Sequence, residues 1–366
     1  MKKHSKKQIA LVYDRVNKWG GAERVLLSLH KMFPKAELFT SVYDKKSASW
    51  AKVFPKVTTS FLQKIPFAKS NHELLAPLMP LAFESFDFSG YDLVISVTSE
   101  AAKGIKTSGK TIHICYCLTP TRYLWSGYSD YFKGLAFKSI TKPIVRYLRS
   151  WDIKAAKRPD VIIAISTEVQ KRIKKYYHRD SKIVFPPVNT STLNGNKVFR
   201  QKTYYLMVSR LDYGYKKVDL AIETFNKLGY SLIIVGSGRD EVRLKSIANK
   251  NIKFMGKVTD KKLREIYRSA KALIMPQVED FGIVALEAQS LGVPVIAFKS
   301  GGVLDTVIDK RTGVLFNKQN SESLRKAVLR FDKMKFKVDN LVTNAKKFSE
   351  EKFRQNFAKI IKHATN

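Results

Sequence analysis

The sequence predicts an α/β fold with two similar domains, each built on a mostly parallel β-sheet. Three observations lead to this prediction. The 366 residues suit two domains of about 150 residues each. Short apolar, β-branched runs alternate with longer helical patterns, which is typical of parallel strands buried on both faces. This alternation occurs twice, on either side of a polar segment with paired prolines, VFPPVNTSTLNGN.

Ten strands are expected, five in each half of the chain. Helical patterns separate them, for example over residues 22–33 and 219–228. The expected strands are residues 8–13, 37–43, 92–97, 112–117 and 160–166 in the first half, and 203–209, 230–236, 252–256, 271–276 and 293–298 in the second.

The polar segment interrupts both the helix and the strand patterns, and therefore marks a boundary between the domains. We place this boundary at Asn189, so that residues 1–189 form the N-terminal domain and residues 190–344 the C-terminal domain. The Lys-rich end of the chain predicts amphipathic helices. The last of them, at about 345–366, is expected to pack back on the N-terminal domain.

The chain is strongly basic, with 67 Lys and Arg against 31 Asp and Glu and a net charge of +36. Such a field attracts polyanions, which include nucleic acid, an anionic bilayer surface and phosphate-bearing small molecules. The lysines are spread along the whole chain, so the charge does not choose between these partners. Simple solvation of the helices by lysine remains an equal alternative.

Two segments, residues 61–88 and 131–158, combine large apolar groups with an irregular pattern, and the second is also basic. A surface helix of that composition suits an anionic membrane, where each nearby Lys or Arg contributes about 1 kcal/mol. The alternative is that both segments are ordinary helices of the first domain. No stretch approaches a membrane span, and two cysteines are too few for a disulfide framework. We therefore expect a cytoplasmic protein that is peripheral at the inner membrane face.

The most informative segment is EDFGIVALE, which directly follows a predicted strand. Glu279 lies in the loop at the C-terminal end of that strand, where open α/β sheets bind ligands. Phe281, Gly282 and Ile283 would offer free backbone N–H groups at the start of the next helix, and such groups bind phosphate or a polarised hydroxyl. Glu287, in the early turns of this helix, would accept both hydroxyls of a ribose. The alternative, an acidic helix start, explains neither the glycine nor the spacing of the two acids.

A second loop, between the strand at 203–209 and the next helix, carries Arg210 and Lys216. Two cations there would neutralise a leaving diphosphate. Gly20 and Gly21 open a helix after the first strand and would let a ligand approach the backbone. No His, Cys or carboxylate cluster has the spacing of metal ligands, so we expect no metal and no cofactor.

Together these motifs resemble the retaining glycosyltransferases of family four (GT4), which have the GT-B fold. The resemblance spans nearly the whole chain and implies two Rossmann-like domains that face each other across a cleft. The chain is most similar to bacterial O-antigen and polysaccharide mannosyltransferases. The matching segments are GGAERVL, AAKGI, TPTRYLW, AISTEVQKRI, PPV, SRLDYGYKKVDLAI, GKVTD and EDFGIVALE.

The resemblance implies roles for the residues of the C-terminal domain. Glu279 would contact the transferred sugar, while Arg210 and Lys216 would stabilise the leaving phosphates. The backbone from Phe281 to Ile283 would bind sugar hydroxyls and the diphosphate, and Glu287 would bind the ribose.

The resemblance also implies contacts to the nucleotide base and from the first domain. Val258 would present its backbone to the base, and Asp260 would accept hydrogen bonds from guanine N1 and N2, which favours GDP over UDP. An ordinary helix start is the alternative for Asp260. Gly20 and Gly21 would close over the donor from the first domain.

Two features depart from the family pattern. Many relatives have a histidine immediately before the Thr-Pro of the first-domain motif, where this chain has Leu118. This motif, with Thr119 and Arg122, is expected on the acceptor side. The loop DYGYKK is one residue longer than usual, which leaves Lys216 and Lys217 as alternative phosphate ligands.

The resemblance implies a metal-independent hexosyltransferase that retains anomeric configuration. It would move a hexose, mannose being one option, from a GDP- or UDP-linked donor to a lipid-linked or oligosaccharide acceptor in cell-surface polysaccharide synthesis. Two alternatives remain. A basic nucleic-acid-binding protein would account for the charge, but the chain has no recognised binding motif and we expect no nucleic acid partner. A nucleotide-sugar epimerase would use the same fold without an acceptor.

Overall fold

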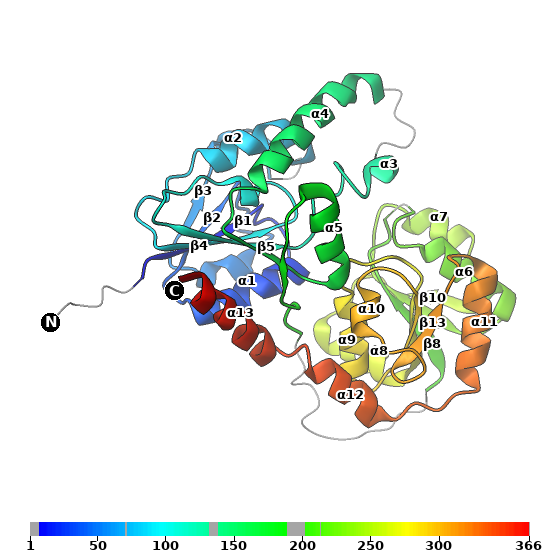
Figure 1. The fold of residues 1–366 in the computed structure, drawn as a ribbon. Helices are drawn as coiled ribbons and strands as arrows, with labels where there is room; N and C mark the ends of the chain where they lie inside the picture. The colour runs from blue at the N-terminus through cyan, green and yellow to red at the C-terminus, as the bar shows by residue number, and fades with distance from the viewer. Residues whose placement is uncertain (1–6, 70–71, 132–137, 189–201, 213, 366) are drawn as a thin grey trace. The chain divides into compact units, whose positions relative to one another are not determined.

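The computed structural model describes residues 7–69, 72–131, 138–188, 202–212 and 214–365 (Figure 1). The chain divides into two compact units. Unit 1 contains Met1–Pro187 and Phe353–Asn366, and unit 2 contains Val188–Lys352. The boundary that the sequence predicts, at Asn189, lies outside the described residues.

Within the described residues of unit 1, seven parallel strands form one sheet in the order β3-β2-β1-β4-β5-β6-β7. Its central strand β4 is buried along its whole length, as expected of a parallel sheet covered on both faces. The strands are β1 (Ile9–Tyr13), β2 (Glu37–Thr40), β3 (Val57–Thr59), β4 (Leu93–Thr98), β5 (Ile112–Cys117), β6 (Val161–Ala164) and β7 (Lys182–Ile183).

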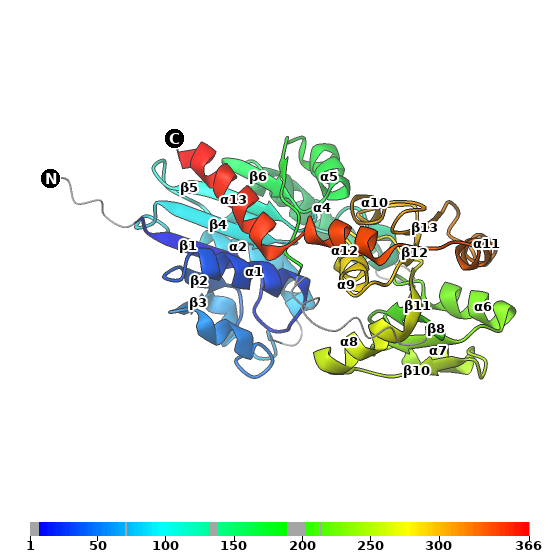
Figure 2. The same ribbon diagram turned by 90° about the horizontal axis from the view of Figure 1, so that it is seen from below.

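Helices cover both faces of this sheet. The first and last helices, α1 and α13, lie on one face, and α2 and α4 lie on the other (Figure 1, Figure 2). The α-helices of the unit are α1 (Gly21–Met32), α2 (Met79–Glu84), α3 (Tyr128–Tyr131), α4 (Lys138–Ala155), α5 (Thr167–Tyr177) and α13 (Glu350–Thr365), and the 3₁₀-helices are η1 (Ser49–Val53), η2 (Phe61–Lys64), η3 (His72–Leu78) and η4 (Ala102–Gly104).

The C-terminal helix α13 packs into unit 1 through aromatic side chains. Phe353 and Phe357, one turn apart, are both buried, and each ring centroid lies 5.9 Å from that of Tyr116 in β5. Cys115 and Cys117, the neighbours of Tyr116 in the strand, are buried and form no disulfide bond. These contacts place the end of the chain on the central strands of unit 1.

Unit 2 repeats the architecture. Within its described residues six parallel strands follow the order β10-β9-β8-β11-β12-β13. They are β8 (Tyr204–Val208), β9 (Leu232–Val235), β10 (Ile252–Phe254), β11 (Ala270–Met275), β12 (Val295–Phe298) and β13 (Gly313–Phe316). The predicted class, α/β with two parallel-sheet domains, is confirmed.

Two apolar cores cover the faces of the second sheet. One is centred on Phe225 and Phe331, and the other on Tyr267 and Ala285. The strand order reverses direction between β8 and β11, and the loops after these two strands lie at the edge where doubly wound sheets bind ligands. The helices are α6 (Val218–Leu228), α7 (Glu241–Ser246), α8 (Asp260–Ser269), α9 (Ile283–Ser290), α10 (Val303–Thr306), α11 (Ser321–Asp332) and α12 (Val338–Lys346).

Both irregular segments of the first half form helices of unit 1. Residues 61–88 form η2, η3 and α2, and the described part of 131–158 forms α4, while residues 132–137 lie outside the described residues. Among the described side chains of each segment, some apolar groups are buried and others are exposed. Among the described residues, no helix is both long enough and apolar enough to cross a bilayer.

Candidate active site

The two motif loops of unit 2 meet at the point where its strand order reverses. Lys216 lies in the loop after β8, and Glu279 lies in the loop after β11. The Lys216 ammonium donates to Glu279 Oε1 over 2.6 Å. Gln277 Nε2 donates to the same oxygen over 2.9 Å. No residue in the described ranges contacts the other carboxylate oxygen, Oε2. The side chain of Glu279 is 21% exposed, and its orientation is fixed through Oε1.

Glycines after β12 position the backbone of Glu279. Gly302 N–H donates to the Glu279 carbonyl over 2.7 Å, and Glu279 forms a β-bridge with Gly301. A Cβ on Gly301 would lie 2.5 Å from the Glu279 carbonyl oxygen, and one on Gly302 would lie 2.4 Å from Phe281 Cα. These approaches exclude any side chain at either position. The sequence interpretation missed this Gly-Gly turn and also Gln277, although both directly follow strands.

Helix α9 begins where the sequence predicts. Gly282 is the N-cap with a φ of 89°, in the left-handed region that favours glycine. Ala285 N–H donates to the Gly282 carbonyl over 3.0 Å. The N–H groups before it have no acceptor within the helix, and they lie at the positive end of its dipole. Phe281 is 4% exposed and packs against Phe348 with 5.7 Å between ring centroids. Glu287 is half-buried and follows Ile283 by one turn, so both lie on one side of the helix.

The two cations of the other loop differ in environment. Arg210 is 71% exposed and pairs with Asp212 over 3.2 Å, so it does not reach Glu279 in this structure. Lys216 contacts Glu279. Lys217 is the N-cap of α6, with a φ of 52°, and lines a surface pocket with Asp219. The geometry therefore favours Lys216 over Lys217 as the lysine of this site.

The expected base contacts lie at the start of α8. Val258 is half-buried and packs against the apolar core. Thr259 caps the helix by accepting from Lys262 N–H over 3.3 Å, and Asp260 is the exposed first residue. Asp260 thus occupies the position of an ordinary acidic helix start, and its contact with guanine stays a prediction.

Two further glycines have a structural role. The turn after β9 contains Gly236 and Gly238, and glycines in such a turn can let a ligand approach the backbone closely. In the structure they approach protein backbone instead: a Cβ would lie 1.8 Å from the Ser209 carbonyl oxygen and 2.2 Å from that of Leu211, respectively. The turn therefore supports the loop that carries Arg210.

Gly20 and Gly21 lie at the start of α1 in unit 1. Gly20 is the N-cap in an extended conformation that any residue adopts, so its φ of −178° does not require glycine. A Cβ there would lie 3.1 Å from Glu23 Oε2. The buried Glu23 accepts a hydrogen bond from the Tyr13 hydroxyl over 2.7 Å, and burial is the largest of the effects that raise the pKa of this tyrosine.

The predicted acceptor-side residues follow β5 in unit 1. Leu118 is half-buried and donates its N–H to the Thr98 carbonyl over 2.7 Å. Thr119 is buried, with its hydroxyl 3.4 Å from Arg172 Nη1. The backbone carbonyl of Arg122 accepts from two residues further along the loop. Thr119 therefore stabilises the loop rather than presenting a free group.

Across the described ranges, no three His, Cys, Asp or Glu side chains are grouped to bind a metal ion. Metal independence stays a prediction. In the same ranges, the polar centre of unit 2 consists of one ion pair, one amide and the start of a helix. Such a set can orient an oxygen-rich ligand and stabilise negative charge that develops on a leaving group.

The sequence is similar to that of known proteins. Residues 191–348 match the family model described as Glycosyl transferases group 1. An uncharacterized glycosyltransferase of Methanocaldococcus jannaschii is 24% identical over 54% of this chain and 56% of its own length. A GDP-mannose-dependent monoacylated alpha-(1-6)-phosphatidylinositol monomannoside mannosyltransferase of Corynebacterium glutamicum is 42% identical over 21% of this chain and 23% of its own length. The chain thus spans about half the length, or less, of the curated relatives it matches.

The fold comparison covers nearly the whole chain. The crystal structure of Anabaena HepE in complex with UDP-glucose superposes with a TM-score of 0.71 at 18% identity, over 97% of this chain and 99% of that one. The prediction of a GT-B fold is confirmed. Residues 191–348 thus match the model of the group 1 glycosyltransferases, and the fold of the chain is that of the GT-B glycosyltransferases.

Proposed function

We propose that this chain is a retaining hexosyltransferase. It moves a hexose from a nucleotide diphosphate sugar to a lipid-linked or oligosaccharide acceptor in cell-surface polysaccharide synthesis. One observation carries the proposal: Lys216 and Glu279, which are 63 residues apart in the chain, meet at the ligand-binding edge of unit 2 beside the start of α9. The proposal includes no metal and no cofactor.

Each group of this site has a role in transfer. Glu279 Oε2 accepts a hydrogen bond from a hydroxyl of the transferred sugar, while Lys216 and Gln277 fix the carboxylate through Oε1. An ammonium has three donor hydrogens, so Lys216 also reaches an oxygen of the leaving diphosphate. Arg210 is exposed, and its planar guanidinium donates two parallel hydrogen bonds to the same diphosphate. Front-face attack with retention then depends on positioning and on charge stabilisation.

The names of the similar proteins suggest two candidate donors. The C. glutamicum relative is named as dependent on GDP-mannose, and Asp260 suits a guanine. The Anabaena structure contains UDP-glucose. We therefore propose a GDP- or UDP-linked hexose, with GDP-mannose as the first candidate.

Thermal melting with nucleotide sugars tests the proposal directly. A ligand that binds only the native state stabilises it by about 2.7 kcal/mol at a hundred times its Kd. We expect one of GDP-mannose, UDP-glucose and their ADP and TDP counterparts to raise the melting temperature by several degrees. Free hexoses at the same concentration are the control. If none of the nucleotide sugars shifts the transition, the chain does not use such a donor.

We further propose that unit 1 meets an anionic membrane. Seven large apolar side chains are exposed on η2, η3, α2 and α4 and the turn after η2, and they define the apolar surface of unit 1: Phe61, Phe67, Leu74, Leu78, Leu81, Ile144 and Tyr147. The exposed Lys64, Lys142 and Arg146 lie among them in the sequence. Helices η3 and α4 are neighbours, since Ala76 of η3 packs against the cluster of Leu124, Val145 and Leu148, whose last two members lie on α4. Apolar groups with basic neighbours suit an anionic interface.

Helix α4 connects this surface to the acceptor-side loop. Its buried side packs against Leu124 and Trp125. Arg149 Nε donates to the Leu124 carbonyl over 2.7 Å, and its guanidinium lies 4.8 Å from the ring centroid of Tyr128. An acceptor with a lipid anchor would therefore meet the loop next to the bilayer.

Flotation with liposomes tests the membrane contact. Leu74 and Leu81 are 80% and 56% exposed, and burying each leucine contributes about 1.5–3 kcal/mol. We expect Leu74→Glu with Leu81→Glu to lower binding to anionic vesicles at least about tenfold. Val242→Glu is the matched control, because Val242 is 83% exposed on α7 of unit 2. Equal loss in both variants, or binding that ignores lipid charge, would count against this surface.

A further inference from the structure

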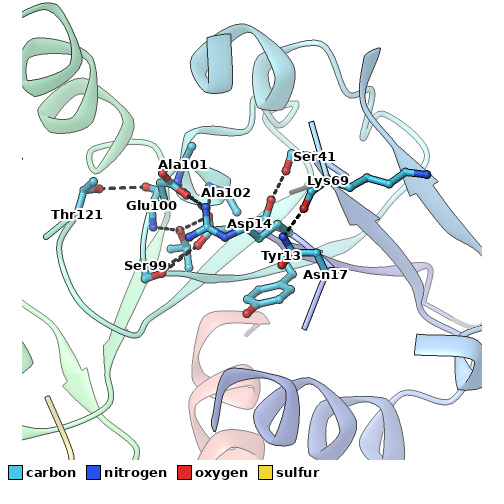
Figure 3. Close-up of polar contacts among 12 residues, drawn as sticks. Tyr13, Asp14, Asn17, Ser41, Lys69, Ser99, Glu100, Ala101, Ala102 and Thr121 are labelled. Carbon is cyan, nitrogen blue, oxygen red and sulfur yellow. Dashed lines mark hydrogen bonds and ion pairs between the residues drawn. The ribbon is translucent and has the colours of Figure 1, made fainter. Parts of the chain in front are cut away.

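The sheet of unit 1 has its own reversal of strand order, between β1 and β4. By the same rule as in unit 2, the loops after these two strands mark a ligand-binding edge. Asp14 and Arg15 follow β1, and Ser99 and Glu100 follow β4. Hydrogen bonds join Asp14 to Ser99 and Arg15 to Glu100, and each pair is 85 positions apart in the chain. Figure 3 shows Asp14, Ser99 and Glu100 in this polar cluster.

Asp14 fixes the turn after β4. Its Oδ1 accepts from the N–H groups of Ala101 and Ala102 over 3.0 and 2.9 Å and from the Thr98 hydroxyl over 2.8 Å. Its Oδ2 accepts from Ser99 N–H over 2.7 Å (Figure 3). The Asp14 side chain is 2% exposed and its acceptor sites are occupied. Asp14 is therefore a positioning residue, and the group it positions is Glu100.

Glu100 and Arg15 form an ion pair at this edge. Arg15 Nη1 donates to Glu100 Oε2 over 2.7 Å, and the side chains are only 16% and 7% exposed. The Tyr123 hydroxyl also donates to Glu100, and the Glu100 carbonyl accepts from the Thr121 hydroxyl over 3.3 Å. Removing both charges from water costs several kcal/mol, so a pair of this kind is weak support for a role in stability alone.

The guanidinium of Arg15 has unused capacity. It carries five N–H donors, of which Nη1 is engaged with Glu100. No other hydrogen bond joins Arg15 to any residue that the structure describes, and its nitrogens are not sealed from solvent. The hydrogen bond to Glu100 therefore fixes the orientation of the guanidinium, and its remaining N–H donors are available to an oxygen-rich ligand.

We propose that Arg15 and Glu100 bind two neighbouring hydroxyls of a neutral sugar, the terminal residue of the acceptor. This inference rests on the proposed function, for which it names the acceptor class. Arg15 donates to the oxygen of one hydroxyl and Glu100 accepts from the other. The two charges cancel and the Asp14 carboxylate lies beside them, so the site favours a neutral diol over a phosphate.

Saturation-transfer NMR on the full chain tests the site. The probes are methyl glycosides of mannose, galactose and glucose, with inorganic pyrophosphate as the charged alternative. We expect at least one methyl glycoside to give a signal that excess pyrophosphate does not displace. Arg15→Lys, which keeps a charge but loses the planar fork, and Glu100→Gln should each weaken its affinity about tenfold or more. Glu84→Gln is the matched control, because Arg158 and Glu84 form a similar pair over 2.7 Å elsewhere in unit 1.

The outcomes separate this site from the proposed function. Absence of any glycoside signal in the unchanged protein, displacement by pyrophosphate, or equal weakening in Glu84→Gln would each overturn the site. The fluorescence of the four tryptophans, all in unit 1, verifies that each variant is folded. Melting with nucleotide sugars is measured on the same samples. Loss of glycoside binding with an intact donor shift supports the site, whereas a missing donor shift in the unchanged protein refutes the transferase proposal on its own.

Discussion

Glu279→Gln is expected to lower the rate of sugar transfer by about 10²–10³-fold, the loss typical when a group that stabilises transition-state charge is removed. An amide keeps the size of the side chain but would place an N–H₂ group or a weaker acceptor opposite the sugar. It would also lose the ion pair with Lys216, which is 2.6 Å long in this structure. Initial rates with a radiolabelled donor measure the effect.

Lys216→Met should reduce transfer to a similar degree, because the leaving diphosphate then lacks its nearest cation. Lys217→Met is the matched control: it removes the same charge from the next residue, whose side chain lines a pocket away from Glu279. We expect Lys217→Met to stay within about threefold of the unchanged enzyme, or ~0.7 kcal/mol. Full turnover in both Glu279→Gln and Lys216→Met would refute the assignment of the site.

Sequence patterns predicted most of the fold because its strands are buried on both faces. All ten expected strands are present. Most are short apolar, β-branched runs, and residues 93–98, for example, are buried along their whole length. Three short strands were missed, at 57–59, 182–183 and 313–316. Two to four residues carry too little periodicity to separate a strand from a loop.

The candidate site was predictable where a residue's role depends on its neighbours in the chain. Glu279 and Gly282 follow a strand and begin a helix, and both features are local. The glycines of other loops were not predictable in this way. Gly236 and Gly301 are required by the backbone carbonyls of Ser209 and Glu279, which approach them from distant parts of the sequence.

The polar cluster of unit 1 shows the same limit more strongly. Arg15 and Glu100 are 85 residues apart, and each alone is an ordinary charged residue after a strand. Only the strand order, which makes β1 and β4 neighbours, brings them together. A search for charged residues after every predicted strand would have included both, but it would not have paired them.

The second prediction with a large effect concerns a buried ion pair behind this cluster. Lys103 Nζ lies 2.5 Å from Asp152 Oδ1, and the two side chains are 2% and 1% exposed. Asp152 also accepts from Trp125 Nε1 over 2.7 Å and from the Tyr177 hydroxyl over 2.8 Å. Burial is the largest single effect and lowers the pKa of Lys103, but Asp152 and other nearby acidic groups together raise it by more, so that the net pKa lies above its usual value. The pair joins η4, the acceptor-side loop, α4 and α5.

Lys103→Met is expected to lower the free energy of unfolding of unit 1 by about 3–5 kcal/mol, because it leaves the Asp152 carboxylate buried without a counter-charge. Asp152→Asn should cost a similar amount by stranding the ammonium. The double substitution should cost less than the sum of the two by on the order of 1–3 kcal/mol, since no unpaired charge remains. Urea unfolding followed by tryptophan fluorescence measures unit 1 selectively, because all four tryptophans lie in it.

The control is Lys174→Met. Lys174 forms an ion pair with Asp180, and the two side chains are 64% and 92% exposed. Removing this lysine should leave the unfolding midpoint unchanged. Strict additivity of Lys103→Met and Asp152→Asn would show that the two charges do not stabilise each other. If they are coupled, the loop from Thr121 to Trp125 owes its position to this pair, since both ends donate to Asp152. Tyr123 lies between those ends and donates to Glu100. The ion pair between Lys103 and Asp152 would therefore also help to position Glu100 in the proposed sugar site.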